Sequence, residues 1–589
     1  MATVHDVDVV IVGAGGAGLR AAIEISQRHA CAVLTKVFAP RSHTGTAQGG
    51  VCAALGNEEP DEPIWHVYDT VKGSDYLGDQ NAIEIMCNDA PRAIIELEHM
   101  GMPFSRTPEG RIGQRRFGGH TRNFGEAPVK RACYSADRTG LVMQHTLFEN
   151  AIKHGVRFFH EFHLTDLIIR DGRCAGAVAI DLLTGEVHVF HARAVMMATG
   201  GYGRAYRVTS NAHVGTGDGM WLAWRAGAPL EDMEFVQFHP TGLWKLGILV
   251  SEAARGEGGI LRNRVGERFM ERYAPTVKDL APRDMVSRAI ITEIREGRGI
   301  AAPDGTQYVH LDLTHLGREI IDEKLPEITG FARTYLGVDP TREEIPVAPT
   351  THYAMGGIPT DTEGHVLADH TGRIIDGLYA AGECACVSVH GANRLGTNSL
   401  LDIIVFGRRA GKTMVAYVAG ADAPTLPADA PDRTTAAMSR LMKGSGSEST
   451  AKIRLELQEM MMRDCGVFRT EKGLRDAIEK IRELQDRCRR VAVSDDGTVF
   501  NTDLVEALEL ESLLGVADAI ATSALNRTET RGAHSREDYP ARDDEHWLKH
   551  TFISHRPDGA HEIAYKDVDL KLWKVDGDEK HFKPKPRIY

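Results

Sequence analysis

Residues 7–18 read VDVVIVGAGGAG and decide the fold class of this 589-residue chain. The apolar run 7–12 has the composition of a buried strand, a GxGxxG sequence follows it directly, and residues 19–25 continue with helical spacing. A glycine-rich turn between a strand and a helix lets the backbone approach a pyrophosphate at the helix N-terminus. We therefore predict a dinucleotide-binding β-α-β unit, which a second strand-like run at 31–35 completes.

The pattern of a strand followed by glycine occurs twice more. Residues 194–198 lead into Thr199-Gly200-Gly201, and residues 377–381 lead into Gly382-Glu383. The segment between them has short mixed elements and many charges, which is typical of an inserted domain. We predict an α/β chain with a discontinuous Rossmann-like dinucleotide-binding domain at 1–238 and 347–422, a capping domain at 239–346, a helical domain at 423–535 and a small C-terminal domain at 536–589.

The helical domain is predicted from a proline-rich linker and from three periodic segments. Pro424, Pro427 and Pro431 lie among Ala and Asp, a linker composition. Helical periodicity then recurs at about 449–463, 470–491 and 502–526, and this predicts a three-helix bundle with Thr470 and Thr502 as N-caps. The chain ends in the Lys/Pro-rich sequence HFKPKPRIY at 581–589, which we expect to be solvated rather than docked.

Composition and charge exclude several classes of protein. Lys and Arg number 69 and Asp and Glu number 82, a net charge of −13 that disfavours nucleic-acid binding. No apolar run approaches the ~18 residues of a membrane span. The nine cysteines show no C-x2-C spacing, so neither an iron–sulfur cluster, a zinc site nor a disulfide framework is expected. The spacing of the cysteines likewise predicts no metal site in the chain. No presequence pattern precedes residue 7, so we expect a cytoplasmic chain.

The fingerprint alone leaves NAD and FAD open. The acidic residue usual at the end of the second strand is absent, because Thr35-Lys36 stand there. Only one GxGxxG occurs, which disfavours a reductase that binds two dinucleotides. Glu383 at a strand end can accept hydrogen bonds from sugar or ribityl hydroxyls, so FAD is the better expectation.

A set of motifs spread over nearly the whole chain resembles one family. These motifs are GAGGAG at 13–18, RSHT at 41–44, QFHPTG at 237–242, RGEGG at 255–259, HYAMGG at 352–357, HGANRLG at 390–396 and RGAHSR at 531–536. Together they resemble the flavoprotein subunit of succinate dehydrogenase and of the closely similar quinol:fumarate reductase. The resemblance implies FAD bound covalently through His43. It also implies FAD contacts at Gly13, Ala14, Gly15, Gly16, Ala17, Gly18, Thr35, Lys36, Ser42, Thr44, Gln48, Gly49, Gly50, Asp218, Glu383, Ser399 and Leu400.

A dicarboxylate substrate needs cations and neutral donors, and loop-like motifs supply candidates. The resemblance assigns His239, His352 and Arg394 to the substrate carboxylates. A hydroxyl contact is usually threonine in the family, whereas this chain has Ser251, which keeps the donor but loses a methyl group.

The resemblance also implies a proton path. Arg283 accepts the proton from the substrate, and Glu252 and Arg255 relay it toward solvent. Glu252 and Arg255 are spaced i, i+3, so one helical turn would place them on the same face.

The activity implied is oxidation of succinate to fumarate, with electrons passing to an iron–sulfur subunit and then to quinone. The alternative is a quinol:fumarate reductase that runs the reverse reaction. Membrane-anchor subunits, which can include a cytochrome b, would hold the chain at the cytoplasmic face of the cell membrane. Three alternatives are disfavoured. L-Aspartate oxidase lacks the RSHT motif that this chain has. The net negative charge argues against a flavoprotein that modifies tRNA, and the substrate motifs argue against a non-catalytic flavin-binding scaffold.

Overall fold

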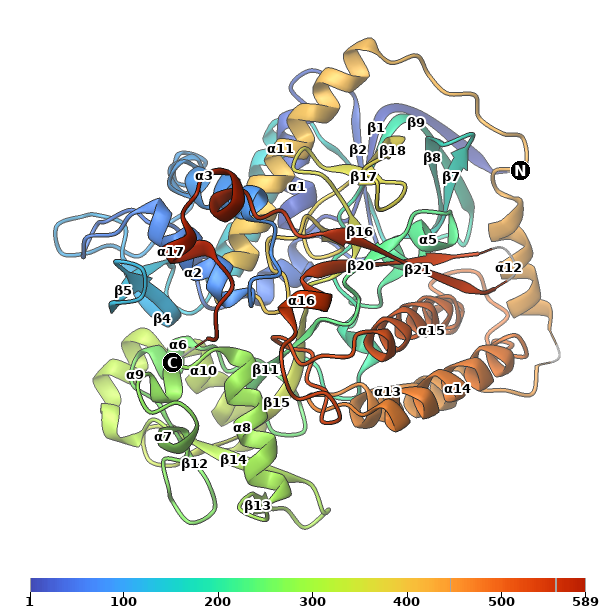
Figure 1. The fold of residues 1–589 in the computed structure, drawn as a ribbon. Coiled ribbons are helices and arrows are strands. Elements are labelled where there is room, and N and C mark those ends of the chain that lie inside the picture. The colour runs from blue at the N-terminus through green and yellow to red at the C-terminus, as the bar shows by residue number, and fades with distance from the viewer. Residues whose placement is uncertain (1, 445, 557–558, 588–589) are drawn as a thin grey trace.

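The computed structural model describes residues 2–444, 446–556 and 559–587 (Figure 1). Its centre is an eight-stranded sheet in which β18, β9, β1, β2 and β6 lie side by side and run parallel. The bounds of these strands are β1 Thr3–Val12, β2 Cys31–Thr35, β6 Arg157–His160, β9 Val187–Met197 and β18 Ile374–Ala380. Three further strands extend the sheet: β7 Phe162–Arg170, β8 Arg173–Asp181 and β17 His365–Leu367.

Both faces of this sheet are covered, which explains the continuous apolar run in β1. Val9 and Ile11 pack in one buried cluster with helix α1, while Val10 and Val12 pack in another with Trp224. Alternate side chains of a strand point to opposite faces, so both sets must be apolar. The helices of this domain are α1 Gly16–Ile25, α2 Pro63–Gly73, α3 Gln80–His99, α4 Thr139–Lys153, α5 Asp218–Arg225 and α11 Asn398–Gly420. A small antiparallel sheet of β3 Val51–Cys52, β4 Gln114–Arg122 and β5 Ala127–Cys133 lies beside them.

The capping domain forms a separate body with its own core (Figure 1). The chain enters it through β11 and returns through β15, two neighbouring antiparallel strands. Helix α8 packs against β11, where the Ser287 hydroxyl donates to Phe238 O at 2.8 Å. The elements are β11 Val236–Leu243, β12 Ile260–Arg262, β13 Ile300–Ala301, β14 Gln307–Asp312, β15 Ile345–Ala354, α6 Ala253–Gly256, α7 Met270–Tyr273, α8 Arg283–Arg295, α9 Arg318–Lys324 and α10 Pro326–Phe331.

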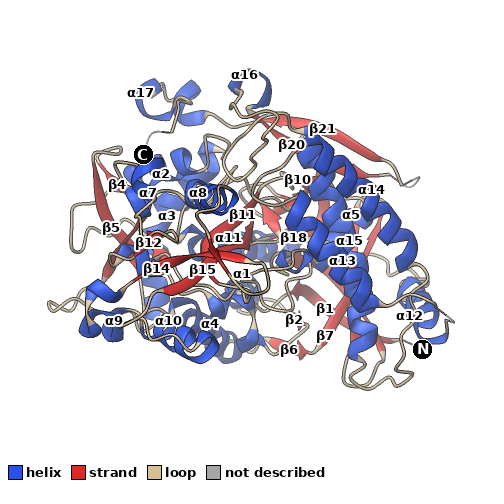
Figure 2. Ribbon diagram, turned by 90° about the horizontal axis from the view of Figure 1, so that it is seen from below, coloured by secondary structure: helices blue, strands red, loops and turns tan. Residues whose placement is uncertain are grey.

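The helical region contains the three predicted helices and one more. Figure 2 shows α13 Thr450–Asp464, α14 Glu471–Cys488 and α15 Thr502–Asn526 packed together, with α12 Asp432–Lys443 before them. Thr470 caps α14 as predicted, because its hydroxyl accepts from Gly473 N. The prediction for Thr502 is wrong: Asn501 caps α15, and its side chain accepts from Leu504 N at 2.7 Å.

The C-terminal region returns to the dinucleotide-binding domain. Strands β20 Lys549–His555 and β21 His561–Asp567 form a sheet with β10 Leu230–Glu231, and α16 Asp544–Trp547 and α17 Glu579–Phe582 flank them. The expectation of a solvated tail is wrong for Arg587, whose side chain is only 8% exposed and pairs with Asp75 and Asp284. Within the described residues, no helix is both long and apolar enough to cross a membrane.

Candidate active site

The glycines at the end of β1 are required by close backbone contacts. Gly13 has φ +111°, and a β-carbon there would lie 2.1 Å from Ala198 O. A β-carbon on Gly18 would lie 2.0 Å from Gly13 O. The turn therefore brings α1 against the sheet, and the start of α1 faces a cavity, as a dinucleotide pyrophosphate requires.

This cavity encloses about 1610 Å³ of empty space, including its open mouth. It extends from the glycine turn, past the ends of β2, β9 and β18, to the edge of the capping domain. Most of the predicted site residues line it; Gly18, Glu252 and Arg255 do not. The predicted residues on its wall are Gly13, Ala14, Gly15, Gly16, Ala17, Thr35, Lys36, Ser42, His43, Thr44, Gln48, Gly49, Gly50, Asp218, His239, Ser251, Arg283, His352, Glu383, Arg394, Ser399 and Leu400.

Several buried polar atoms on this wall need a ligand. Thr199 Oγ1, Thr397 Oγ1 and Asp218 Oδ1 have no hydrogen-bond partner among the residues that the structure describes. Unpartnered buried groups are costly, so hydroxyl and phosphate groups of a dinucleotide fit this lining. Lys36 holds Asp218 in place with an Nζ–Oδ2 distance of 2.6 Å, and it also pairs with Glu509 of α15 at 2.8 Å.

His43 lies in the same wall, in the loop after β2. Its Nδ1 is 3.3 Å from Ala212 N, and its Nε2 is 3.3 Å from Asn211 Nδ2. Burial, with a contribution from Arg204, lowers the pKa of His43 to about 4. The imidazole is therefore neutral at physiological pH, which is the form that can act as a nucleophile.

Glu383 follows β18, as its place after a strand predicted. Its Oε1 accepts from Ala354 N at 3.1 Å, and burial raises the pKa of the carboxyl group to about 7. Near neutral pH the group is therefore partly protonated, so it can donate as well as accept hydrogen bonds.

At the far end of the cavity, two histidines face each other from β11 and β15. The ring centroids of His239 and His352 are 5.0 Å apart. Burial and the nearby Arg283 hold the pKa of each imidazole well below its usual range, so both are neutral. Thr241 N donates to His239 Nδ1 at 3.2 Å, which places the proton of His239 on Nε2. That atom has no partner among the described residues and so offers a donor to a ligand.

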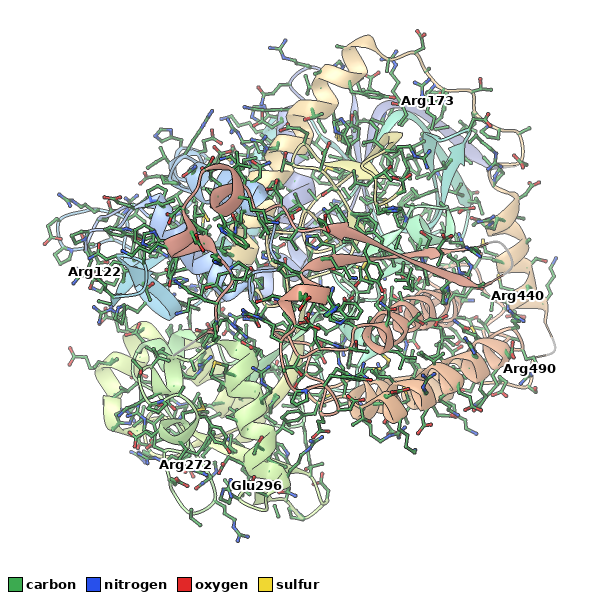
Figure 3. All side chains as sticks on the ribbon, viewed as in Figure 1. Arg122, Arg173, Arg272, Glu296, Arg440 and Arg490 are labelled. Carbon is green, nitrogen blue, oxygen red and sulfur yellow. The ribbon has the colours of Figure 1, made fainter. Side chains whose placement is uncertain are left out.

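Arg394 brings a buried cation to the histidines. Its guanidinium stacks 4.3 Å from the centre of the Tyr353 ring, and its backbone carbonyl accepts from Gln237 Nε2 at 2.8 Å. Burial and the neighbouring Arg283 lower the pKa of Arg394 to about 9, so it remains charged at neutral pH. In contrast, Arg272 and Arg440 lie at the periphery of the molecule (Figure 3).

Arg283, the first residue of α8, stands between the cavity and Glu252. Its Nε donates to Glu252 Oε2 at 2.9 Å, and its Nη1 donates to Gln237 Oε1 at 3.0 Å. Arg255 lies behind this pair, with Nη2 3.7 Å from Glu252 Oε2, and donates to Asp279 O. Burial alone would raise the pKa of Glu252, but Arg255 and Arg283 hold it below its usual value. The three residues form a continuous row that leads away from the cavity.

The sequence reasoning missed residues that support this site. Gln237 bonds both Arg283 and the Arg394 carbonyl, although only His239 of its motif was singled out. Asn211 contacts His43 and donates to His352 O at 3.0 Å. No glycine or charge pattern marks Asn211, whereas the QFHPTG motif itself was a signal for Gln237.

The fold and the site define a class: a dinucleotide-binding flavoprotein in which the capping domain borders the cationic end of the flavin cavity. A family described as FAD binding domain matches residues 8–400, and one described as Fumarate reductase flavoprotein C-term matches residues 454–589. The succinate dehydrogenase flavoprotein subunit of Coxiella burnetii is 50% identical, with 99% of each chain covered. The mitochondrial succinate dehydrogenase flavoprotein of Oryza sativa is 49% identical over 99% of this chain and 93% of its own. The chain belongs to the succinate dehydrogenase/fumarate reductase flavoprotein family.

Solved structures are similar over the whole chain. A quinol fumarate reductase flavoprotein of E. coli has a TM-score of 0.90 at 41% identity, covering 96% of this chain and 97% of its own. Mycobacterium smegmatis Sdh1 has a TM-score of 0.83 at 38% identity, with 99% of both chains covered.

Proposed function

We propose that this chain oxidises succinate to fumarate, with FAD as the hydride acceptor. The observation that carries the proposal is the convergence of His239, His352 and Arg394 on one end of the flavin cavity, opposite Arg283. Neutral histidine donors and a desolvated arginine suit two carboxylates, because charge-assisted hydrogen bonds are strong in a buried site. The Ser251 hydroxyl lines the same end and adds a donor.

Oxidation removes a hydride from one methylene carbon of succinate and a proton from the other. Bound FAD supplies the hydride acceptor. We infer that Arg283 first releases a guanidinium proton to Glu252, whose Oε2 is 2.9 Å from Arg283 Nε, and then takes the proton from the substrate. Arg255, whose Nη2 is 3.7 Å from Glu252 Oε2, continues the path toward solvent. Gln237 accepts from Arg283 and donates to the backbone carbonyl of Arg394, so it fixes the position of Arg283 relative to the substrate that Arg394 binds.

We further propose that FAD is attached covalently through His43. Two observations support this assignment: the imidazole is a partly exposed part of the wall of the flavin cavity, and its lowered pKa keeps it neutral and nucleophilic. The remaining cofactor contacts are assigned to the glycine turn, to Thr35, Lys36, Asp218 and Glu383, and to the start of α11 at Ser399 and Leu400.

Oxidation of the substrate leaves two electrons on the flavin, and the chain has no C-x2-C spacing for a cluster of its own, so the electrons are expected to leave through a partner. The nine cysteines are free and buried. We propose an iron–sulfur subunit as the acceptor, and membrane-anchor subunits that hold the complex at the cytoplasmic face of the membrane. The named relatives at 49–50% identity are succinate dehydrogenases, whereas a fumarate reductase flavoprotein of Mycobacterium tuberculosis is 43% identical. Succinate oxidation is therefore the favoured direction.

The test is substrate-driven reduction of the flavin in the purified holoenzyme under anaerobic conditions. Succinate should bleach the flavin absorbance, malonate should compete with it, and L-aspartate should have no effect. Bleaching by L-aspartate but not by succinate would overturn the proposal. Reduction of fumarate by a reduced dye should proceed at the same site and be blocked by malonate.

A further inference from the structure

The interface between the capping domain and the dinucleotide-binding domain contains a cavity. Beside Arg283 the two bodies enclose a second cavity of about 1180 Å³, including its open part. Lys72 and His120 line it from one side, and Leu280 and Pro282 from the other. Since the covalent attachment is the strand pair β11–β15, polar contacts elsewhere must help to hold the two bodies together.

The last described residue of the chain makes such a contact. Arg587 Nη2 lies 2.6 Å from Asp284 Oδ2 in the capping domain and 3.1 Å from Asp75 Oδ2 in the dinucleotide-binding domain. One guanidinium therefore joins carboxylates from both bodies. Burial alone would raise the pKa of Asp284 and of Asp75, but Arg587 is the largest influence that holds each below its usual value. The guanidinium group and the two carboxylates are thus charged, and all three side chains are almost completely shielded from solvent.

A second contact ties the same helix to the C-terminal region. Arg288, one turn along α8, donates to Gly532 O at 2.7 Å and also pairs with Asp284 at 2.9 Å. Gly532 N in turn donates to Asp75 Oδ2 at 2.9 Å. The start of α8 is thus held from both sides by C-terminal residues.

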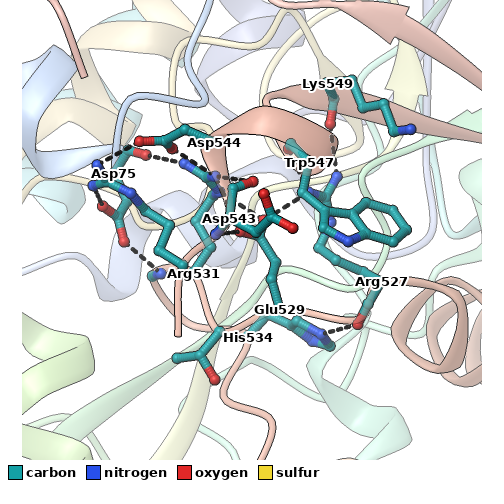
Figure 4. A network of polar contacts seen from close by, with 12 residues as sticks. Asp75, Arg527, Glu529, Arg531, His534, Asp543, Asp544, Trp547 and Lys549 are labelled. Atoms are coloured by element: carbon teal, nitrogen blue, oxygen red, sulfur yellow. Dashed lines mark hydrogen bonds and ion pairs between the residues drawn. The ribbon is translucent and has the colours of Figure 1, made fainter. Parts of the chain in front are cut away.

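The C-terminal residues are themselves rigidly anchored. Figure 4 shows Arg531 among Glu529, Asp544 and Asp75, with Arg527 bound to Glu529 on the other side. Both guanidinium groups are fully buried and pair with Glu529. Arg531 Nη1 also donates to the backbone carbonyl of Asp75, in the loop after α2. A paired and hydrogen-bonded buried network gives a fixed base rather than a flexible one.

The same contacts lie next to residues of the proposed active site. Asp284 is the neighbour of Arg283 at the start of α8, and Ala533 N donates to Ala392 O at 2.8 Å, two residues before Arg394. A displacement of the α8 N-terminus would therefore move Arg283 relative to the substrate.

We propose that two C-terminal residues, Gly532 and Arg587, hold the capping domain against the dinucleotide-binding domain by binding the start of α8. Arg587 is thereby a positioning residue for Arg283. This inference rests on the proposed function, because it assigns the closed state to substrate retention. Without the contact of Arg587 with Asp75 and Asp284, the start of α8 separates from Asp75 more often. Dicarboxylates then leave the site faster, and Arg283 is less often positioned to accept the proton.

The test compares Arg587→Gln with Lys583→Gln in the flavin-loaded enzyme. Lys583 belongs to the same tail but is 49% exposed, and among the described residues it contacts neither Asp75 nor Asp284: its ammonium group pairs with Glu579 of α17 and lies 5.7 Å from the centre of the Trp573 ring. In Arg587→Gln, malonate Kd should rise at least about tenfold, in line with loss of one partner of a buried charge pair. Amide hydrogen exchange in residues 283–288 should accelerate, and flavin content should stay unchanged. Lys583→Gln should match the unmodified enzyme in all three measurements.

A double variant separates positioning from general stability. If Arg587 acts through Asp284, then Arg587→Gln with Asp284→Asn should weaken malonate binding no more than the stronger single change. Additive effects, or unchanged malonate Kd and exchange in Arg587→Gln, overturn the inference. If Arg587→Gln does not fold, Asp284→Asn removes the capping-domain partner of Arg587 instead, and an unchanged malonate Kd there overturns the inference equally. Failure of the unmodified enzyme to bind malonate would instead reject the proposed function.

Discussion

The side chains of the substrate end differ in charge although burial and Arg283 lower the pKa of each, because the ordinary pKa of arginine is far above that of histidine. His239 and His352 are neutral because burial and the positive charge of Arg283 both disfavour protonation. Arg394 stays charged at neutral pH although burial lowers its pKa. A dianion therefore meets neutral donors and fixed cations in one pocket, and no histidine must release a proton before binding. Substrate affinity should consequently change little with pH between about 6 and 8.

Replacement of His43 tests the flavin linkage. His43→Ser should retain noncovalent FAD and some fumarate reduction but lose most succinate oxidation, because a histidyl link raises the flavin potential and succinate is a poor reductant. Fluorescence of acid-precipitated protein measures the link directly. His213→Ser is the matched control and should keep the covalent link, because His213 is exposed and lies next to Asn211 and Ala212, the residues that contact His43. Acid-precipitated unmodified holoenzyme without flavin fluorescence would refute the covalent assignment.

Replacement of Arg394 tests the carboxylate site. Arg394→Lys should weaken malonate binding by ~2 to 4 kcal/mol, because lysine cannot reproduce the planar fork and the partner carboxylate stays buried. The stacking on Tyr353 is lost as well. Titration with malonate, followed through the flavin spectrum, gives the affinity. Arg272→Lys at the capping-domain surface (Figure 3) should leave it unchanged, and an unchanged Kd in Arg394→Lys would place Arg394 outside the site.

Among the elements, β20 is joined to the loop before α3 and to β10 by a charged histidine. His550 Nδ1 lies 2.6 Å from Asp232 Oδ2, and its Nε2 lies 3.1 Å from Asp79 Oδ1. Burial alone would lower the pKa of His550, but Asp232 and Asp79 raise it to about 10. A raised pKa in the folded state stabilises below the unfolded value of about 6.5, and this contribution is lost as pH rises toward 10.

His550→Gln should therefore lower the unfolding midpoint more at pH 6 than at pH 10. The loss at low pH should be of the order of a few kcal/mol, since one pKa unit corresponds to ~1.4 kcal/mol. Thermal unfolding of both proteins across this pH range measures the difference. His546→Gln, a histidine that is 69% exposed, should show little change at any pH. A gap that widens toward pH 10 would contradict this role for His550.

The predictable and unpredictable elements differ in the range of their interactions. The β1–α1 unit and the Thr470 cap depend on neighbours within a few residues, so the sequence pattern predicted both. Asn501 was missed because two capping residues, Asn501 and Thr502, stand side by side and only the backbone decides between them. The Lys36 pairs with Asp218 and Glu509 join residues far apart in the chain, so no local pattern could reveal them.

For the whole molecule, the motifs predicted which residues share a site but not how the domains are held. Many residues that line the cavity belong to motifs whose glycines and histidines were visible in the sequence. The expectation that the histidines lie in loops is wrong, because His239 and His352 lie on strands β11 and β15. The docking of Arg587 was not, because a Lys/Pro-rich terminus has the composition of a solvated tail, whereas Asp75 and Asp284 provide a buried anion pair for one arginine. The net charge of −13 gave no hint of this local pairing.

The central claim, succinate oxidation with Arg283 as proton acceptor, is tested most directly by the rate of flavin reduction by succinate in Arg283→Gln. Arg295→Gln is the control, because Arg295 lies on the same helix but is 50% exposed and pairs with Glu537. We predict that Arg283→Gln reduces the flavin at least ~10²-fold more slowly, the range for a lost acid–base group, with FAD content and malonate affinity near those of the unmodified enzyme. Retention of more than about a tenth of the rate would contradict the assignment and make His239 or His352 the next candidate.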